Sequence, residues 1–473
     1  MSIQGFCIHG HFYQPPREDP ITGVIPIEPG ALPFRNWNER IHDQCYRPNA
    51  VQGNYERISF NFGPTLLNWM EKYDAGTLGQ IVEQDRFNLQ AHGVGNAMAQ
   101  AYNHTILPLA PRTAKVTQVR WGIADFEHRF GHKPAGMWLP EAAVDDETLE
   151  VLVDNGIQYT ILAPWQADET GLDTTQPYWV NLSGGRRIVV FFYNQGLSTR
   201  VSFDPWATIN ADSFIMNYLL PQYSNHSHSD NPQIVIVASD GELYGHHQPF
   251  RDKFLAYLMG GALRNHPTIN ATYPGLWLKK YKPKKSVKIR QATSWSCHHG
   301  VMRWNGPCGC TPHGEWKSAM RIAFEQISAL IDGVGQQLGN LLIKDWPEIK
   351  NQYIHVILGE LSAWELINQH AKHELDEDEI CKIELLLRAN EDRQRMFTSC
   401  GWYFDDYDRI EPKNNTAYSA EAIWLVLRAT GIDLSQNAMA LLKPVKSWRT
   451  GLRADVVFNH YLQRARAMVE CEA

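Results

Sequence analysis

The chain has 473 residues, of which 44% are hydrophobic and 11% aromatic, and its formal net charge is only -7. This length allows one large core and a second, smaller one, so we expect a globular protein of two structural units. The mild charge, with Lys and Arg scattered apart from a short basic run at residues 279–288, argues against a nucleic-acid partner and favours neutral substrates.

Neither membrane insertion nor secretion is indicated by the sequence. It has no stretch of about 20 uninterrupted apolar residues, and residues 1–14 lack the basic start and apolar run of a secretory signal. Eight cysteines are too few for a disulfide framework in a chain of this length. We therefore predict a soluble, cytoplasmic protein with reduced thiols and no membrane partner, and the oligomeric state stays open.

Short apolar runs recur through the first three hundred residues, between longer polar and helical stretches. Continuous apolar runs, as opposed to alternating ones, indicate strands covered on both faces, as in a parallel sheet or an α/β barrel. Between two of them, Asp145 and Asp146 precede a helical run that stops at Gly156, as expected for a βαβ unit. Seven or eight runs favour a barrel over an open sheet. The expected strands are residues 3–8, 58–62, 87–91, 135–139, 159–162, 188–193, 234–238 and 287–291.

The pattern changes after about residue 312. Apolar side chains follow the three-to-four spacing of an amphipathic helix at residues 316–331, 354–366, 380–397, 420–430 and 456–469. We therefore predict an α/β fold with two domains, a barrel over residues 1–311 and an α-helical domain over residues 312–473.

Chemistry in an α/β barrel lies at the C-terminal ends of the strands, so polar residues directly after each expected strand are candidates. The first strand leads into His9 and His11, and then Gln14. Two histidines two residues apart on an extended segment point the same way, so we expect both to face the barrel mouth and to bind ligand hydroxyl groups or a metal. The alternative is one histidine hydrogen-bonded in the core and the other exposed.

A glutamate follows the fourth expected strand. Trp138 is followed by Leu139, Pro140 and Glu141, which places the carboxylate beside an indole at a position where a nucleophile is useful. A glutamate at this position can equally cap the next helix.

The seventh expected strand ends in the densest group of polar side chains. Two carboxylates, a tyrosine and two histidines fall within eight residues, namely Asp240, Glu242, Tyr244, His246 and His247. With Glu141 on another strand end, Asp240 completes a carboxylate pair. Retaining glycosidases need two such carboxyls about 5 to 5.5 Å apart, one as nucleophile and one as acid and then base. Crowding of acids is one way to keep the second carboxyl protonated near neutral pH.

Together and in this order, the three motifs resemble those of glycoside hydrolase family 57, which carries an H-x-H-Q-P, a W-x-x-E and a D-x-E-x-(aromatic)-G segment. The matching residues are His9 and His11 for the first motif, Trp138 and Glu141 for the second, and Asp240, Glu242, Tyr244 and Gly245 for the third. Phe12 and Tyr13 interrupt the first motif. The resemblance covers roughly residues 1–310 well and the helical remainder more loosely.

The resemblance implies an incomplete (β/α)7 barrel followed by a helical domain that helps to close the active site. Glu141 would be the nucleophile and Asp240 the general acid/base of a retaining hydrolase or transglycosylase acting on α-glucans, with no metal or other cofactor. An oligo- or polysaccharide would be the partner, bound by His9, His11, Gln14, Trp138, Glu242, Tyr244 and His246. The family's G-Q-x-E motif has no clear counterpart, and we expect His92, after the third expected strand, to take its place.

Three cysteines lie close together between the two predicted domains. Cys297, Cys308 and Cys310, with histidines nearby, offer soft ligands of the kind that zinc binds. Because structural zinc sites usually show cysteine pairs two to four residues apart, a C-x-C pair with a lone upstream cysteine fits poorly. We therefore assign no metal and predict a loop that lines the cleft, with Trp304 stacked on sugar. Trp402 is predicted either to reach the cleft as a substrate platform or to pack in a helix corner.

Two other functions fit the same residues. A metal-dependent deacetylase or mannosidase-like enzyme would use His9, His11 and Asp240 as ligands, and a chelator would abolish its activity. A non-catalytic glycan-binding protein would retain the barrel but would have no need for both Glu141 and Asp240. The linkage that is cut, and the choice between water and a second sugar as acceptor, stay open.

Overall fold

The computed structural model describes residues 3–223 and 231–472. The chain divides into two compact units, one formed by residues 1–14, 27–101 and 126–295, and the other by residues 15–26, 102–125 and 296–473. The second unit thus begins before residue 311 and also takes in two segments from the N-terminal half.

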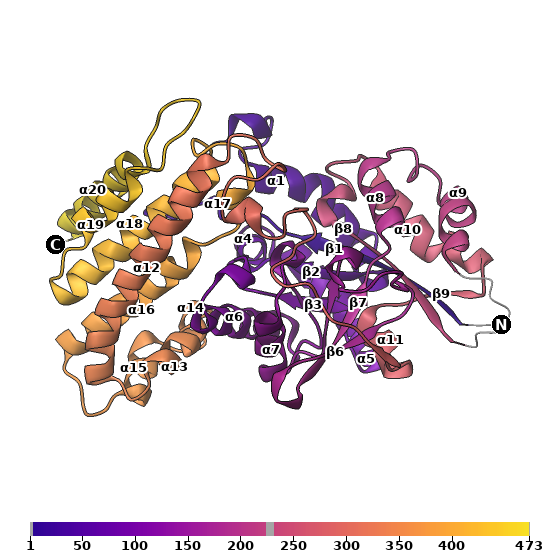
Figure 1. Cartoon of the computed structure of the whole chain (residues 1–473), viewed down its shortest axis with the longest axis horizontal. Coiled ribbons are helices and arrows are strands. Elements are labelled where there is room, and N and C mark those ends of the chain that lie inside the picture. The colour runs from indigo at the N-terminus through magenta and orange to yellow at the C-terminus, as the bar shows by residue number, and fades with distance from the viewer. Residues whose placement is uncertain (1–2, 224–230, 473) are drawn as a thin grey trace. The chain divides into compact units, whose positions relative to one another are not determined.

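The first unit is built on parallel strands (Figure 1). Five of them pair in the order β4-β3-β2-β1-β8 and curl through 202°. The strands are β1 (Gln4–Phe12), β2 (Ser59–Phe62), β3 (Ala97–Gln100), β4 (Met137–Trp138), β5 (Tyr159–Leu162), β6 (Tyr178–Asn181), β7 (Arg187–Phe192), β8 (Gln233–Asp240), β9 (Ile269–Ala271) and β10 (Lys285–Ser286).

Two further parallel strands continue the curl. Gly136, next to β4, bridges to Tyr159 of β5, and β5 pairs in parallel with β7. After β7, the main-chain N–H of Asn194 donates to the carbonyl oxygen of Ile236 in β8 at 2.7 Å. Seven parallel strands therefore follow one another in the order β8-β1-β2-β3-β4-β5-β7, which confirms the predicted incomplete seven-stranded barrel.

Helices surround the strands of this unit in Figure 1. They are α1 (Trp37–Ile41), α2 (Arg47–Val51), α3 (Asn54–Arg57), α4 (Pro64–Tyr73), α5 (Ala75–His92), α7 (Asp146–Asp154), α8 (Gln195–Phe203), α9 (Ala211–Phe214), α10 (Arg251–Gly260) and α11 (Pro274–Lys280), with π-helical turns η2 (His42–Tyr46) and η7 (Ile215–Leu219). As the sequence indicated, Asp145 caps α7, its side chain accepting a hydrogen bond from the main-chain N–H of Thr148.

Six of the eight expected strands overlap observed ones, and the third was wrong. Residues 87–91 form the last turn of α5, and Phe87 is 55% exposed instead of buried in a sheet. Gly93 ends the helix with a left-handed φ of 66°, its N–H donating to the carbonyl oxygen of Leu89 at 2.7 Å. The third strand is β3, which begins at Ala97. Residues 287–291 follow β10 and contribute a single bridge, from Ile289 to Ala167.

The second unit is helical. Its longest helices, α12, α16, α18 and α20, lie side by side in Figure 1, and α12 buries the apolar stripe that the sequence predicted, from Trp316 to Ile331. The helices are α6 (Arg112–Phe130), whose last turn belongs to the first unit, α12 (Glu315–Leu342), α13 (Trp346–Gln352), α14 (Ile354–Ile357), α15 (Ala363–His370), α16 (Glu377–Arg395), α17 (Cys400–Tyr403), α18 (Ile410–Thr430), α19 (Ser435–Leu442) and α20 (Ala454–Glu472).

Specific polar contacts tie the N-terminal segments to these helices. Both guanidinium nitrogens of Arg120 donate to the carboxylate of Glu348, at 2.5 and 2.7 Å, and Arg464 pairs with Asp19 at 2.7 Å. Bidentate pairs of this kind fix orientation as well as position. Among the described residues, no helix combines the length and apolar character that crossing a bilayer requires.

Candidate active site

Glu141 lies in a strained turn directly after β4. Glu141 (φ 58°) and Ala142 (φ 47°) both adopt left-handed backbone conformations within the short helix η4 (Pro140–Ala142), which cost a non-glycine residue about 1 to 3 kcal/mol each. Trp295 holds the turn, because its main-chain N–H donates to the carbonyl oxygen of Glu141 at 2.9 Å and its indole N–H donates to Oε2 at 3.0 Å. Since Asp145 caps α7, the alternative role of Glu141 as a helix cap is wrong.

Asp240, the last residue of β8, is the second carboxylate of the pair. It stands beside His11 in the β1–β8 register and is accessible to solvent. The protein atoms around its carboxyl group nevertheless displace water, and this desolvation, together with the negative charge of Glu141, raises the pKa of Asp240 to about 7. Near neutral pH a large share of Asp240 is therefore protonated and able to donate a proton.

Glu242, two residues after Asp240, is buried. Its Oε1 accepts a hydrogen bond from the hydroxyl of Tyr46 at 2.7 Å and one from the main-chain N–H of Tyr13 at 3.1 Å. Burial and the charge of Asp240 raise the pKa of Glu242 to about 8, although these hydrogen bonds oppose the shift. Glu242 therefore contributes a mostly neutral carboxyl group and fixes the segment after His11.

A layer of neutral polar groups and stacked rings lies behind the two carboxylates. The ring of Trp138 stacks on those of His9 and His11, with centroids 4.7 and 5.2 Å apart. Both histidines contact Asn61, which also donates to Oε1 of Gln100 at 2.7 Å. Burial lowers the pKa of His9 to about 3 and that of His11 to about 4, so neither carries a charge at neutral pH.

The glycine of the third motif is required by the conformation and the close packing of the backbone. Gly245 has a φ of 139°, and a Cβ added there would lie 2.2 Å from the main-chain oxygen of Gln44. Beside it, Oε1 of the Gln44 side chain accepts a 2.7 Å hydrogen bond from the Nδ1–H of His246. Burial lowers the pKa of His246 to about 4, so this half-buried ring is neutral as well.

The structure brings together most of the predicted site residues, but some of them have no accessible surface that a ligand could contact. His9, Trp138 and Tyr244 are fully buried, so they support the site and offer no surface to a sugar. The hydroxyl of Tyr244 instead pairs with Ser239 at 3.2 Å. Ligand contact by His11, Gln14, Glu242 and His246 stays a prediction.

Three predicted binding residues lie elsewhere. His92 is the last residue of α5, which precedes β3, so it stands at the opposite end of the strands from Glu141 and Asp240. Trp304 and Trp402 belong to the second unit and have no accessible surface. Trp402 packs against Phe324 and Arg321, which supports the helix-corner alternative and removes its role as a platform.

Four residues of the site were missed by sequence reasoning. Asn61 is the third residue of β2 and Gln100 is the last residue of β3, so both lie near the strand ends that carry the carboxylates. Tyr46 donates a hydrogen bond to Glu242, and Trp295 donates one to Glu141. The signal for Gln100 is the apolar run that begins at Ala97, and assigning the third strand to residues 87–91 hides it. No motif marks Trp295.

Within residues 3–223 and 231–472, the barrel mouth offers no group of three or more metal-ligating side chains; the one such group lies in the loop after Trp295. Nδ1 of His9 is paired with Ser59 at 3.0 Å and its Nε2 with Asn61 at 3.2 Å. His9, His11 and Asp240 are therefore not arranged as the ligand set that a metal-dependent deacetylase would need.

Comparison with known proteins agrees with this geometry. The sequence model described as Glycosyl hydrolase family 57 matches residues 33–290, and a second, described as Domain of unknown function (DUF3536), matches residues 313–469. The first match confirms the resemblance that the three motifs suggested.

Curated relatives match over the barrel. An alpha-amylase of Pyrococcus horikoshii is 21% identical over 264 residues, which are 53% of this chain and 38% of that protein. A 4-alpha-glucanotransferase of Thermococcus litoralis is 22% identical over 214 residues, 44% of this chain and 30% of that protein. The matched part thus spans less than two fifths of either relative.

Solved structures match over nearly the whole chain. An exo-type maltose-forming amylase from Pyrococcus sp. ST04 superposes with a TM-score of 0.78 at 16% identity, covering 97% of this chain and 88% of that one. A GH57-type branching enzyme from Pyrococcus horikoshii superposes with a TM-score of 0.60 at 16% identity, covering 98% and 94%. At such low identity these likenesses establish the fold.

Proposed function

Because the chain belongs to glycosyl hydrolase family 57, we propose that it cleaves or transfers α-linked glucans through a covalent glycosyl-enzyme, with Glu141 as nucleophile and Asp240 as general acid/base. The observation that carries the proposal is the unequal treatment of the two carboxyl groups. Glu141 accepts a hydrogen bond from the indole of Trp295, whereas the charge of Glu141 helps to keep Asp240 protonated.

The first half of the reaction breaks the glycosidic bond. A carboxylate oxygen of Glu141 attacks the anomeric carbon, and the bond between that carbon and the leaving oxygen breaks as Asp240 gives its proton to that oxygen. The product is a glycosyl ester on Glu141 and a shortened glucan with a free hydroxyl. A pKa of about 7 on Asp240 suits this step, because a general acid works best near the pH at which the enzyme operates.

In the second half, the acceptor restores the enzyme. Asp240, now ionised, removes a proton from water or from a sugar hydroxyl, whose oxygen attacks the anomeric carbon and releases the carboxylate of Glu141. Two inversions give overall retention. Water as acceptor makes the reaction a hydrolysis, and a sugar makes it a transfer.

The relatives' names favour α-glucans as the substrate class. They include alpha-amylase, 4-alpha-glucanotransferase and 1,4-alpha-glucan branching enzyme. The matched region covers only part of those proteins. The names therefore favour an α-glucosidic bond as the bond that is attacked, and they leave open the chain length of the substrate and the identity of the acceptor.

The test compares the wild-type protein with Glu141→Gln and Asp240→Asn on maltooligosaccharides and glycogen, following reducing ends and chain lengths. We expect products from the wild type and a loss of at least about 1000-fold in Glu141→Gln. Glu83→Gln, an exposed glutamate on α5, is the matched control and should keep full activity. Products that form equally well in Glu141→Gln would overturn the assignment, and no turnover of any α-glucan would overturn the substrate class.

Azide rescue separates the two roles. In Glu141→Ala, azide can replace the nucleophile and give the β-glycosyl azide from an activated α-glycoside after a single inversion. In Asp240→Ala, azide intercepts the glycosyl-enzyme and gives the α-azide after two inversions. The opposite pairing of products and variants would show that the roles are exchanged.

A further inference from the structure

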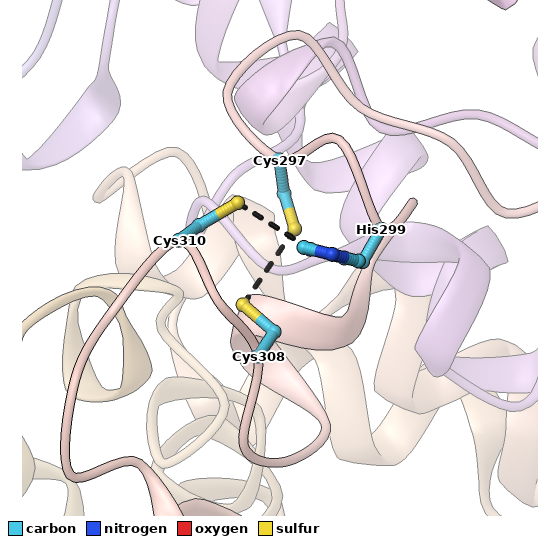
Figure 2. Close-up of side chains that lie close together, drawn as sticks. All are labelled: Cys297, His299, Cys308 and Cys310. Carbon is cyan, nitrogen blue, oxygen red and sulfur yellow. Dashed lines mark hydrogen bonds between the residues drawn. The ribbon is translucent and has the colours of Figure 1, made fainter.

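The loop after Trp295 gathers four soft ligands that the proposed reaction does not use. One ligand atom from each of Cys297, His299, Cys308 and Cys310 lies within 4.8 Å of all the others. Figure 2 shows the three thiols and the imidazole of His299 converging on a common space. Among the described residues this is the one group of three or more such side chains placed in this way.

The separations match the edges of a zinc coordination tetrahedron. The sulfur atoms of Cys297 and Cys308 are 3.9 Å apart, and the sulfur of Cys310 is 3.5 Å from Nδ1 of His299. Zn–S bonds of about 2.3 Å and Zn–N bonds of about 2.05 Å at tetrahedral angles place two sulfurs about 3.8 Å apart and a sulfur and a nitrogen about 3.6 Å apart. A disulfide would need sulfur atoms about 2.05 Å apart, and the three cysteines are free thiols.

The local backbone is shaped to present these ligands together. After His299 the chain turns through Gly300, whose left-handed φ of 75° suits a glycine and whose N–H donates to the carbonyl oxygen of Cys297 at 3.2 Å. The short helix η11 (Met302–Trp304) then leads back to Cys308, whose carbonyl oxygen accepts the N–H of Thr311 at 3.1 Å. Two tight turns therefore bring a C-x-H pair and a C-x-C pair face to face.

The loop is also anchored to its own unit. The guanidinium group of Arg321, on α12, donates from Nε and Nη2 to the carbonyl oxygen of Trp304 at 3.1 and 2.9 Å. Arg303 donates to the carbonyl oxygen of Cys310 at 3.4 Å and lies over the ring of Tyr403, on α17, at 4.5 Å. These contacts tie the segment between the ligand pairs to α12 and α17.

Positive charge beside the thiols suits a metal-thiolate centre. Three thiolates, a neutral imidazole and Zn²⁺ carry a net charge of about -1, which needs a counter-charge where water is scarce. Lys317, only 1% exposed, lies within electrostatic range of Cys297 and Cys308. A buried lysine is costly without anionic neighbours; Asp405 is one such neighbour, and a metal-thiolate centre would be a second that stabilises the ammonium group.

We propose that Cys297, His299, Cys308 and Cys310 bind one zinc ion in a closed Cys3His site that fixes residues 296–311 on α12 and α17. All four positions of the tetrahedron come from side chains, which is typical of a structural site and leaves no position for substrate or water. The cysteine spacing alone predicts no metal, because it lacks a C-x(2 to 4)-C pair. The turns supply what the spacing lacks, since they bring a C-x-H pair and a C-x-C pair together.

The experiment measures metal in the full-length protein purified without chelator. We expect about one zinc per chain by elemental mass spectrometry, released when a mercurial reagent blocks the thiols. Cobalt exchanged into the site should show the intense visible bands and thiolate charge transfer of tetrahedral sulfur ligation. Iron in place of zinc, a cobalt spectrum without thiolate bands, or less than about 0.2 zinc per chain after growth in zinc-supplemented medium would each overturn the proposal.

Variants assign the ligands. Cys308→Ser and Cys310→Ser should lose the zinc and about 5 °C or more of Tm, whereas Cys381→Ser, which removes an exposed cysteine of α16, should keep both. His299→Cys should retain zinc and shift the cobalt spectrum towards that of four thiolates, so it tests the site even if the serine variants fail to fold. Zinc that stays bound in soluble Cys308→Ser and Cys310→Ser would refute the ligand set.

Discussion

The charge of Glu141 is predicted to be one of two causes that keep Asp240 protonated, and Glu141→Gln removes that charge with little change in shape. Asp240 has a pKa of about 7 against an ordinary 3.8, and desolvation is the larger cause. Two unit charges about 5.5 Å apart, the separation in retaining glycosidases, interact by about 0.75 kcal/mol in water and about 3 kcal/mol at an effective dielectric of 20. Because solvent reaches Asp240, we take the interaction free energy between the two charges as about 1.5 kcal/mol. Glu141→Gln removes this interaction and should therefore lower the pKa of Asp240 by about one, to about 6.

The assay is an infrared titration of the carboxyl C=O band. Subtracting the spectrum of the Glu141→Gln, Asp240→Asn double variant from that of Glu141→Gln isolates the band of Asp240 in the absence of the Glu141 charge. Subtracting the spectrum of Asp240→Asn from that of the wild type gives the pKa of Asp240 in its presence. Glu242→Gln is the matched control, because Glu242 has a pKa of about 8 and is mostly neutral where Asp240 titrates; it should leave the pKa of Asp240 within about 0.3 of the wild-type value. An Asp240 that titrates identically with and without the Glu141 charge would refute the pairing of these carboxyls.

Activity should fall in alkaline solution, because Asp240 loses the proton that it donates in the proposed mechanism. Above its pKa of about 7, kcat/KM should drop about tenfold per pH unit, and a flat profile from pH 6 to 9 on a maltooligosaccharide would contradict this. Trp295→Phe removes the indole hydrogen bond to Glu141, the proposed nucleophile. That bond to a carboxylate is worth about 1.5 to 3 kcal/mol, so kcat/KM should fall roughly 10- to 100-fold, whereas Trp165→Phe, whose indole donates to a main-chain carbonyl at 3.0 Å, should cost less than about threefold. Gly245→Ala forces a Cβ to within 2.2 Å of a main-chain oxygen and should cost about 3 kcal/mol or more in the free energy of unfolding. Gly171→Ala, with a φ of 72° and open space around it, should cost only about 1 kcal/mol, and equal losses in chemical denaturation would argue against close backbone approach as the cause.

The barrel and its two carboxylates could be predicted because their signals are local. Each strand that carries chemistry is a contiguous apolar run, and the residue that follows it in sequence also follows it in space, as Glu141 follows β4 and Asp240 ends β8. The same reasoning failed at residues 87–91, which form the last turn of α5, with Phe87 exposed and Asn88 buried. Helix or strand cannot be decided from so short a run, and only the position of Gly93 as a helix terminator separates the two.

Partners that come from distant segments carried no such signal. Asn61 and Gln100 meet at 2.7 Å because β2 and β3 are neighbours, and neither residue is unusual in its own stretch of sequence. Trp138 and Trp304 illustrate the reverse error. An indole next to a motif or in a polar loop suggests a ligand platform, although large aromatic side chains contribute most where they are buried, as these two are.

Trp295 shows why the environment of Glu141 had to come from the structure. It lies 154 residues from Glu141 in sequence, yet its indole and its main-chain N–H both donate to that residue, and its ring packs edge-on against Trp138 at 5.0 Å. Glu141 and Ala142 adopt left-handed backbone conformations that neither residue favours alone, so the turn needs a partner that fixes it from outside. One tryptophan supplies the main-chain hydrogen bond, the indole donor and the packing surface, and the strained turn is held in place by the same residue that orients its carboxylate.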